Sequence, residues 1–241
     1  MASLGDPIET ASGAWSFGGE TPVGFDDHAR CSIPWYEACH ELVVDLAEHL
    51  VPAGGRCVEV GCSTGALTAR LASRLEPRRA EVVGLDAEPG MIELARERCA
   101  GLGCVRFETA RLEETELARA DLIVSFYTLQ FVAPHRRSLA VQRIREALEP
   151  AGTLILFEKV LSASARNQEI ATSIHHDWKR RQGLSDQEVA GKERSLRGVL
   201  EPQSSAENAA MLRRAGFCEP VPIFRWLNWE GVTARAGADR A

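Results

Sequence analysis

The sequence lacks the features that mark several protein classes. Its 28 Lys and Arg residues are outnumbered by 34 Asp and Glu residues, and the net charge of −6 disfavours binding to nucleic acid by charge alone. Its seven cysteines include no Cys-x-x-Cys pair, which indicates neither a zinc site nor a disulfide framework. The most apolar run, Leu122 to Ala133, is shorter than the ~20 residues of a membrane-spanning helix. We therefore expect no nucleic-acid partner, no membrane and no metal.

The beginning of the chain shows neither a basic segment nor a long apolar segment, so no secretory signal is visible. The cysteines are then expected to be reduced thiols of a cytoplasmic protein. Hydrophobic residues make up 45% and charged residues 26%, as in an ordinary globular protein. The length of 241 residues predicts one or two domains and leaves most cytosolic enzyme classes open.

Short apolar runs alternate with helical periodicity through the middle of the sequence. This rhythm is typical of βαβ units and predicts an α/β fold, with a mostly parallel sheet and helices on both faces. The expected strands are 57–60, 81–86, 104–109, 121–129 and 153–160, and the expected helices are 35–50, 66–75, 90–101, 138–152 and 206–217.

The rhythm breaks at both ends and after residue 160. Residues 1–24 carry scattered Gly and Pro and predict a flexible N-terminal arm. Residues 25–230 are expected to form a single domain, in which the polar segment 161–203 is an inserted helical cap and 221–230 supplies the last strands. Residues 231–241 are expected to be a frayed tail.

The segment EVGCSTG at residues 59–65 follows the first expected strand and opens a helix. Glycines there let the backbone approach a ligand closely, and a helix N-terminus presents free N–H groups to it. Asp86 ends the second expected strand, where an acid can accept both hydroxyls of a ribose. The pattern Glu-x-Gly-x-x-x-Gly with this acid is typical of class I S-adenosyl-L-methionine (SAM) methyltransferases.

Other interpretations of this loop are weaker. The dinucleotide fingerprint needs Gly-x-Gly-x-x-Gly, and a P-loop needs Gly-Lys-Ser/Thr, which the segment lacks. Residues 61–65 do satisfy the Gly-x-Ser-x-Gly elbow of α/β hydrolases, with Ser63 as nucleophile and His135 or His175 completing a triad. That fold places several strands before its elbow, whereas Ser63 follows the first one. A glycine loop without any ligand is the remaining alternative.

Beyond the loop, residues 25–229 resemble the carboxy-S-adenosylmethionine synthases. The distinctive segments are SIPWYE (32–37), GCSTGALT (61–68), SFYTLQFVAP (125–134), FEKV (157–160) and IHHDWKRRQGLSDQE (174–188). Enzymes of that family have the Rossmann-like class I methyltransferase fold. They use SAM and prephenate to make carboxy-SAM for the modification of tRNA wobble uridine. The resemblance also implies a homodimer.

The resemblance carries SAM-binding roles onto this chain by position. It implies that Tyr36 contacts the amino-acid end of SAM, that Asp86 holds the ribose and that Arg111 and Leu112 flank the adenine. The complete expected set is Tyr36, Glu59, Gly61, Cys62, Ser63, Gly65, Asp86, Ala87, Arg111, Leu112, Phe126 and Tyr127. S-adenosylhomocysteine is the expected product of methyl transfer.

Three positions depart from the family pattern. Arg111 stands where the family has an acid, Phe126 stands where it has Asn, and Glu193 stands where it has the arginine that pairs with the extra carboxylate of carboxy-SAM. A carboxylate at that position would repel a carboxylated sulfonium instead of binding it. These departures favour a retained scaffold with changed chemistry.

Candidates for catalysis lie in the expected cap. His175, His176 and Glu193 are the possible general bases, because methyl transfer needs a base only when the nucleophile must lose a proton. A hydrogen-bonded structural role is the alternative for each. The candidate contacts to the second substrate are Trp35, Trp178, Arg181 and Arg194.

The sequence thus predicts a SAM-dependent transferase, with methyl transfer to a small biosynthetic molecule as the first interpretation. Three alternatives stay open. The chain could make carboxy-SAM from SAM and prephenate, it could use a modified SAM or SAM-derived adduct in a displacement or cyclisation, or it could be a non-catalytic SAM-binding partner protein.

Overall fold

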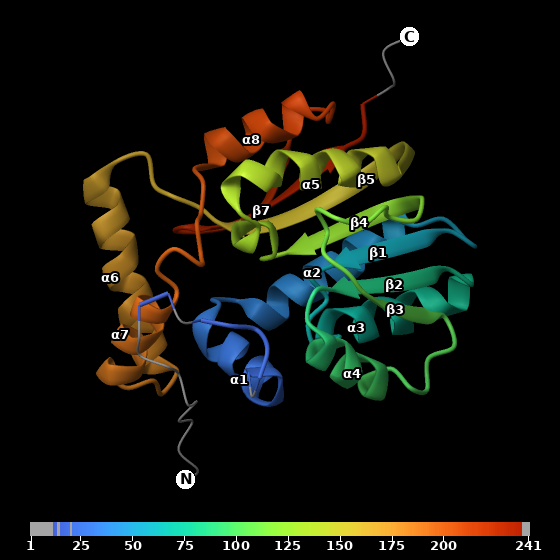
Figure 1. The fold of residues 1–241 in the computed structure, drawn as a ribbon. Coiled ribbons are helices and arrows are strands. Elements are labelled where there is room, and N and C mark those ends of the chain that lie inside the picture. The colour runs from blue at the N-terminus through green and yellow to red at the C-terminus, as the bar shows by residue number, and fades with distance from the viewer. Residues whose placement is uncertain (1–11, 14, 20, 238–241) are drawn as a thin grey trace.

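The computed structural model describes residues 12–13, 15–19 and 21–237. A seven-stranded sheet of order β3-β2-β1-β4-β5-β7-β6 crosses the molecule (Figure 1). Neighbours from β3 to β5 pair in parallel, and β7 pairs antiparallel with β5 and β6. The strands are β1 (Arg56–Val60), β2 (Glu81–Asp86), β3 (Val105–Thr109), β4 (Ala120–Phe126), β5 (Leu148–Lys159), β6 (Val221–Trp226) and β7 (Trp229–Arg235).

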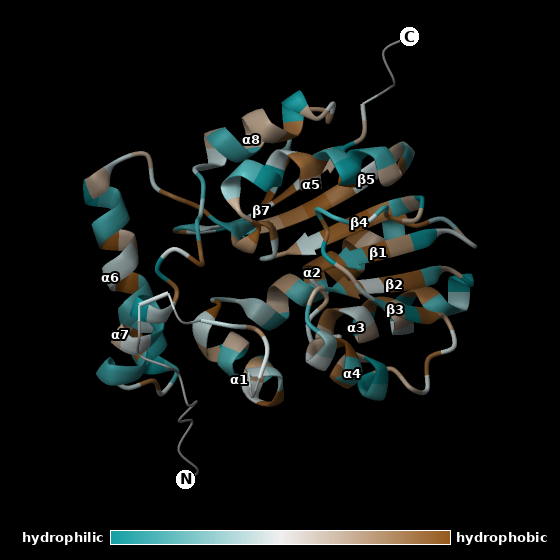
Figure 2. Cartoon of the chain, viewed as in Figure 1, coloured by the Kyte–Doolittle hydropathy of each residue, from teal (hydrophilic) through white to brown (hydrophobic). Residues whose placement is uncertain are grey.

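Helices cover both faces of the sheet and bury its apolar side chains. One core forms where α2 (Tyr36–Leu50) and α3 (Ala66–Leu75) meet the sheet, with Val43, Leu71 and Val82 fully buried. The opposite core lies under α5 (Pro134–Ala147) and α8 (Ser205–Arg214). The apolar colouring in Figure 2 accordingly runs along the strands. The shorter elements are α4 (Pro89–Arg98), η1 (Glu76–Arg78) and η2 (Leu129–Phe131).

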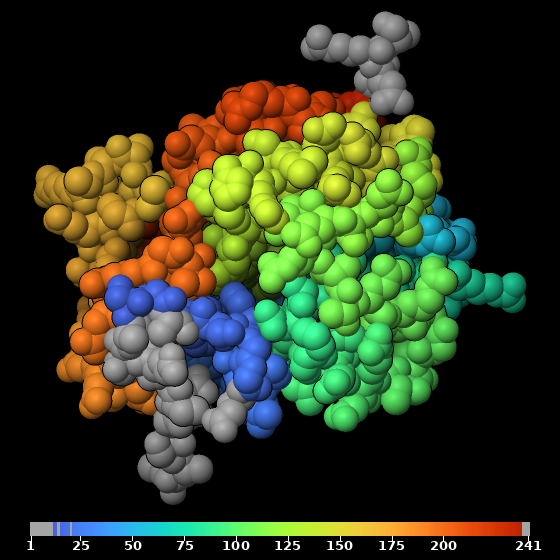
Figure 3. All heavy atoms as spheres, in the orientation of Figure 1, coloured from blue at the N-terminus to red at the C-terminus, as the bar shows by residue number. Residues whose placement is uncertain are grey.

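Two helices of the expected cap stand beside the sheet at the end where β1 and β4 finish. They are α6 (Ala165–Arg181) and α7 (Asp186–Ser195), and α7 begins with a capping box in which Ser185 and Glu188 bond each other's backbone N–H groups. In Figure 3 the orange surface of residues near 185–200 meets the blue surface of α1 (Thr21–Ser32). The cap and the N-terminal helix therefore close over the same end of the sheet.

The predicted α/β fold with a mostly parallel sheet is confirmed, but two boundaries are wrong. The expected frayed tail begins inside β7, an interior strand. Gly231, the first residue of that expected tail, pairs with Phe157, and a Cβ there would come within 2.6 Å of the Phe157 ring.

The boundary at residue 24 falls within α1, which starts at Thr21. Pro22 was interpreted as a loop signal, yet proline at the first turn of a helix is favoured because its missing N–H would be unbonded there. Residues 1–11 of the expected arm lie outside the described residues, as do 14, 20 and 238–241.

Candidate functional site

A cavity of about 530 Å³ opens where β1, β2 and β4 end, beneath α1, α2 and the cap. This is the switch point of the sheet, since β1 lies between β2 and β4, and ligands of open α/β sheets bind there. Of the twelve expected SAM-binding residues, the cavity lining contains all except Gly65. Gly65 lies just behind it, where a Cβ would come within 2.9 Å of Ala95.

The glycine loop passes close to the neighbouring strand. Gly61 has a φ of 72°, and its N–H donates to the carbonyl of Leu85 at 2.7 Å. A Cβ on Gly61 would overlap the side chain of Thr128, whose hydroxyl donates to the carbonyl of Val60. Only glycine therefore fits this turn, because both the positive φ and the close approach exclude a side chain.

Asp86 organises the loop from the end of β2. Its carboxylate accepts the Ser63 N–H at 2.8 Å and the Glu88 N–H at 2.9 Å, while burial raises its pKa. The Ser63 hydroxyl lies against the sulfur of Met91 at 3.4 Å, and no histidine of the described chain forms a hydrogen bond with it. This geometry fits a ribose-binding loop and does not support the hydrolase alternative.

Glu59 lies near the end of β1 and lines the cavity. It is 3% exposed and accepts the hydroxyl of Thr68 at 2.5 Å. Burial raises its pKa to about 8, because ionising a carboxyl group without water is unfavourable. A cationic group of a ligand beside Glu59 would favour its charged form.

Aromatic rings form one wall of the cavity. Phe126 lies 5.7 Å from Tyr36 and 4.7 Å from Tyr127 between ring centroids, and Tyr127 lies 5.1 Å from Trp229. The hydroxyl of Tyr127 is buried without a hydrogen-bond partner in the described chain. Ring faces attract cations, so this wall is suited to a sulfonium group.

Three lysines lie in the same cavity on the cap side. Lys179 and Lys192 are 7% and 6% exposed, and Lys159 ends β5 beside Trp229. Burial and the charge of Lys159 lower the pKa of Lys179 to about 8. Neither Lys159 nor Lys179 forms an ion pair with any residue that the structure describes. The charge of Glu193 reaches both lysines from a smaller neighbouring cavity, but it forms no ion pair with them, so this end of the cavity keeps an excess of positive charge and is suited to an anion.

All three expected catalytic residues line the smaller neighbouring cavity, and of the three only His175 also lines the main cavity. His175 lines the main cavity, where its Nε2 donates to the Ser32 carbonyl at 2.9 Å and burial lowers its pKa to about 3. His176 and Glu193 lie 3.8 Å apart, and the smaller cavity has a volume of about 250 Å³. Glu193 is half-exposed and is not among the residues that line the main cavity.

The four expected substrate contacts also lie outside the main cavity. Trp35 is 59% exposed and precedes α2 with a φ of 61°, and Trp178 stacks on His175 at 6.1 Å. Arg181 and Arg194 are exposed on the cap helices. The aromatic wall of the main cavity therefore consists of Tyr36, Phe126, Tyr127 and Trp229, and neither Trp35 nor Trp178 belongs to it.

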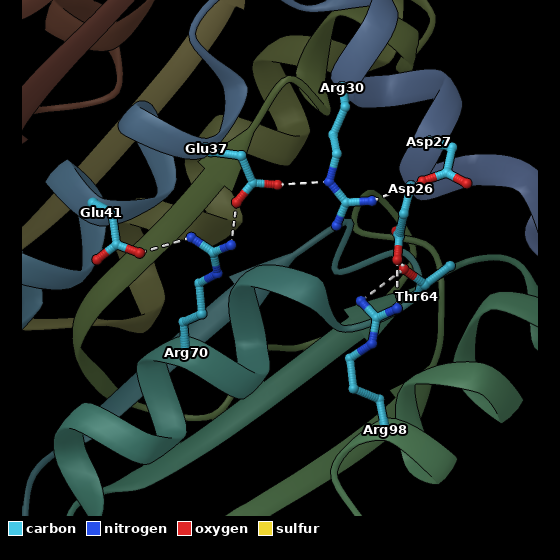
Figure 4. A network of polar contacts seen from close by, with 8 residues as sticks. All are labelled: Asp26, Asp27, Arg30, Glu37, Glu41, Thr64, Arg70 and Arg98. Atoms are coloured by element: carbon cyan, nitrogen blue, oxygen red, sulfur yellow. Dashed lines mark hydrogen bonds and ion pairs between the residues drawn. The ribbon is translucent and has the colours of Figure 1, made fainter.

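An ion-pair network fixes α1 and α2 above the glycine loop (Figure 4). Asp26 on α1 accepts the Thr64 hydroxyl at 2.5 Å and pairs with Arg98 on α4. Glu37 on α2 bridges Arg30 and Arg70, which joins α1 to α3. These contacts hold the α1 residues that line the cavity against the sheet.

Sequence reasoning missed the lysines, His40 and the aromatic pair Trp15 and Phe17, which line the cavity from the segment expected to be an arm. A signal existed for two of them. Lys179 follows His175 by one helical turn, and His40 follows Tyr36 by one turn, so each pair shares a helix face.

Among the described residues, no group of three His, Cys, Asp or Glu side chains is placed to hold a metal ion. Within the same residues, no helix is long and apolar enough to span a membrane.

A family described as a methyltransferase domain matches residues 57–152. The carboxy-S-adenosyl-L-methionine synthase of Nitratiruptor sp. is 35% identical over 92% of this chain and 92% of its own length. The enzyme of that name from Wolinella succinogenes is 34% identical over 88% of this chain and 90% of its own length.

Solved structures agree on the fold. Human N-acetylserotonin methyltransferase in complex with SAM matches with a TM-score of 0.63 at 17% identity, over 90% of this chain and 56% of its own. A SAM-dependent methyltransferase from Aquifex aeolicus matches with a TM-score of 0.63 at 16% identity, over 92% of this chain and all of its own.

Proposed function

This chain belongs to the carboxy-S-adenosyl-L-methionine synthase family of SAM-using transferases, and we propose that it combines SAM with a small carboxylate-bearing molecule. The residues that line the cavity match the separate parts of SAM. Asp86 and the glycine loop match the nucleoside, Glu59 matches a cationic group, and the aromatic wall matches the sulfonium.

The proposal that the second substrate is an anion rests on Lys159 and Lys179. Lys179 is buried and Lys159 is partly buried, and no described carboxylate forms an ion pair with them, although the charge of Glu193 reaches both. A carboxylate beside them would form charge-assisted hydrogen bonds with both ammonium groups. The lysines therefore act by binding and orienting an anion next to the SAM half of the cavity.

We favour carboxy-SAM synthesis over methyl transfer. Repulsion by Glu193 argued against a carboxylated sulfonium, and its charge does reach both lysines, but this side chain is half-exposed, forms no ion pair with them and does not line the main cavity. When bound, SAM supplies a methyl group activated by its sulfonium, and the donor implied by the family resemblance is prephenate. In this interpretation Lys159 and Lys179 hold the donor's carboxylate and then the carboxylate of the product.

Methyl transfer to a carboxylate-bearing acceptor is the second candidate. The observation that favours it is Glu193 itself, because the chain has no guanidinium where the family arginine is expected. His175 is a weak base here, since its pKa of about 3 is far from the operating pH that suits a general base. An acceptor that needs no deprotonation, such as a carboxylate oxygen, would suit this cavity.

Mass spectrometry separates the two candidates. Purified enzyme incubated with SAM and prephenate should yield a SAM derivative that carries one additional carboxyl group. Formation of S-adenosylhomocysteine with a methylated carboxylic acid would instead establish methyl transfer. Failure of any carboxylate-bearing molecule to change SAM turnover would refute the anionic second substrate.

The alkaline limb of the pH profile should report Lys179. Its ammonium group is charged below a pKa of about 8 and loses its charge as the pH rises through that value. We therefore expect the KM for the anionic substrate, measured at saturating SAM, to rise above pH 8. In the Lys179→Arg variant this rise should vanish, because a guanidinium stays protonated throughout the range.

We also propose that the chain from α1 to β7 acts as one SAM-binding unit with 161–203 as its cap, and that two copies associate in the cytoplasm as the family resemblance implies. Light scattering of the purified full chain should give the mass of a dimer, and a monomer at all concentrations would contradict this.

A further inference from the structure

His40 lies on α2 and lines the cavity, whereas Lys159 and Lys179 reach the cavity from β5 and α6. It follows Tyr36 by one turn of α2, and both side chains face the cavity. The imidazole is 1% exposed, and its ring centroid lies 4.2 Å from Tyr36 and 4.7 Å from Phe126. A polar ring is thus enclosed by the aromatic wall.

Neither nitrogen of this imidazole has a hydrogen-bond partner in the described chain. A buried polar atom that stays unpaired costs ~1–3 kcal/mol, so such a group in a ligand cavity points to a partner supplied by the ligand. Burial lowers the pKa of His40 to about 3, which keeps the ring neutral with one donor and one acceptor nitrogen.

The charges around the cavity select which ligand group this partner is. Charges of both signs act on the imidazole, with Arg70 the largest and Glu37, Asp26 and Arg30 after it, so the acid that distinguishes this end is Glu59, which faces the cavity and acts on Tyr36. Lys159 lies over Trp229, two rings along the aromatic wall from Phe126, and Lys179 lines the same cavity. A ligand cation is therefore favoured beside His40, and a ligand carboxylate is favoured at the lysines.

We infer that His40 binds the α-ammonium group of SAM, with a neutral ring nitrogen accepting one of its hydrogens. The inference rests on the proposed use of SAM and assigns to His40 a role that the sequence comparison with the family does not supply. Glu59 lines the same cavity, and its carboxylate would interact with the positive charge of this ammonium group. His40 then orients the methionyl part so that the sulfonium lies against Phe126 and Tyr36.

Calorimetry with two ligands tests this contact without turnover. S-adenosylhomocysteine carries the amino-acid group, whereas 5′-methylthioadenosine has the same nucleoside and a thioether but no ammonium. We expect His40→Leu to weaken S-adenosylhomocysteine binding by about 10-fold or more, as for a lost hydrogen bond to a charged group. Binding of 5′-methylthioadenosine should stay within about twofold of wild type.

Two further variants keep the test decisive. His40→Gln retains an acceptor and should recover part of the lost affinity, whereas His28→Leu, the same change at another buried cavity histidine, should leave the ratio of the two affinities unchanged. Equal weakening of both ligands by His40→Leu, or no weakening, would overturn the inference. These outcomes do not depend on the second substrate. The assignment of that substrate fails if product analysis finds no carboxylate-dependent turnover.

Discussion

Replacing Lys179 by methionine should lower kcat/KM for the carboxylate-bearing substrate by about 100-fold, since losing one partner of a buried charged contact costs ~2–5 kcal/mol. Methionine retains most of the apolar length of the lysine stem, so the packing of α6 against the cavity should survive. Steady-state kinetics with the second substrate varied at saturating SAM measure the effect. The affinity for S-adenosylhomocysteine should change by no more than about twofold, because the ammonium lies on the cap side.

A matched variant distinguishes this loss from general damage to the cap. Lys192→Met removes another buried lysine of the same cavity, but the Lys192 ammonium lies over the ring of Trp15 and has further interactions. Its replacement should lower the midpoint of thermal unfolding more than Lys179→Met does. If Lys179→Met left the KM for every carboxylate unchanged, the proposed anion site would be wrong.

Replacing Gly61 by alanine should weaken SAM binding by about 100-fold, because two costs of ~1–3 kcal/mol each coincide there. The added Cβ is strained at a φ of 72° and overlaps the Thr128 side chain. Relief requires the loop to move away from β4, which displaces the Ser63 N–H from Asp86. Isothermal titration with S-adenosylhomocysteine measures the loss.

Gly54→Ala is the control for backbone strain. Gly54 has a similar φ of 74°, but nothing lies within 4 Å of the position that its Cβ would take. This variant should lower stability slightly and leave ligand affinity unchanged. Equal affinities of the Gly61→Ala and wild-type proteins would show that the glycine loop does not contact the ligand.

The repeating strands and helices could be predicted from the sequence because their signals are local. Periodicity sufficed for β2 and α3, whose predicted bounds, 81–86 and 66–75, match those in the structure. The terminal strand β7 was missed because its pairing with β5 is a long-range contact, and because Gly231 has a packing role against Phe157 that no neighbour in sequence reveals.

The candidate site divides in the same way. Asp86 and the glycine loop follow from a local motif at a strand end, and the cavity contains them. The lysines do not follow, since Lys159 ends a strand and Lys179 belongs to the cap, and only folding brings both to one wall. Glu193 shows the opposite error, because its aligned position implied a place in the main cavity while its helix directs it to the smaller one.

The ion-pair network around Asp26 bears on how long a ligand stays bound and not on how tightly it binds. Helix α1 covers the cavity, and its attachment to the loop and to α4 passes through the hydroxyl of Thr64 and the guanidinium of Arg98. We expect a nucleoside that leaves beneath α1 to require these groups to separate, so the need for this opening should lengthen the residence time of the product. Because Arg98 is about one-third exposed, dissolved salt screens its pair with Asp26 and should shorten that residence time.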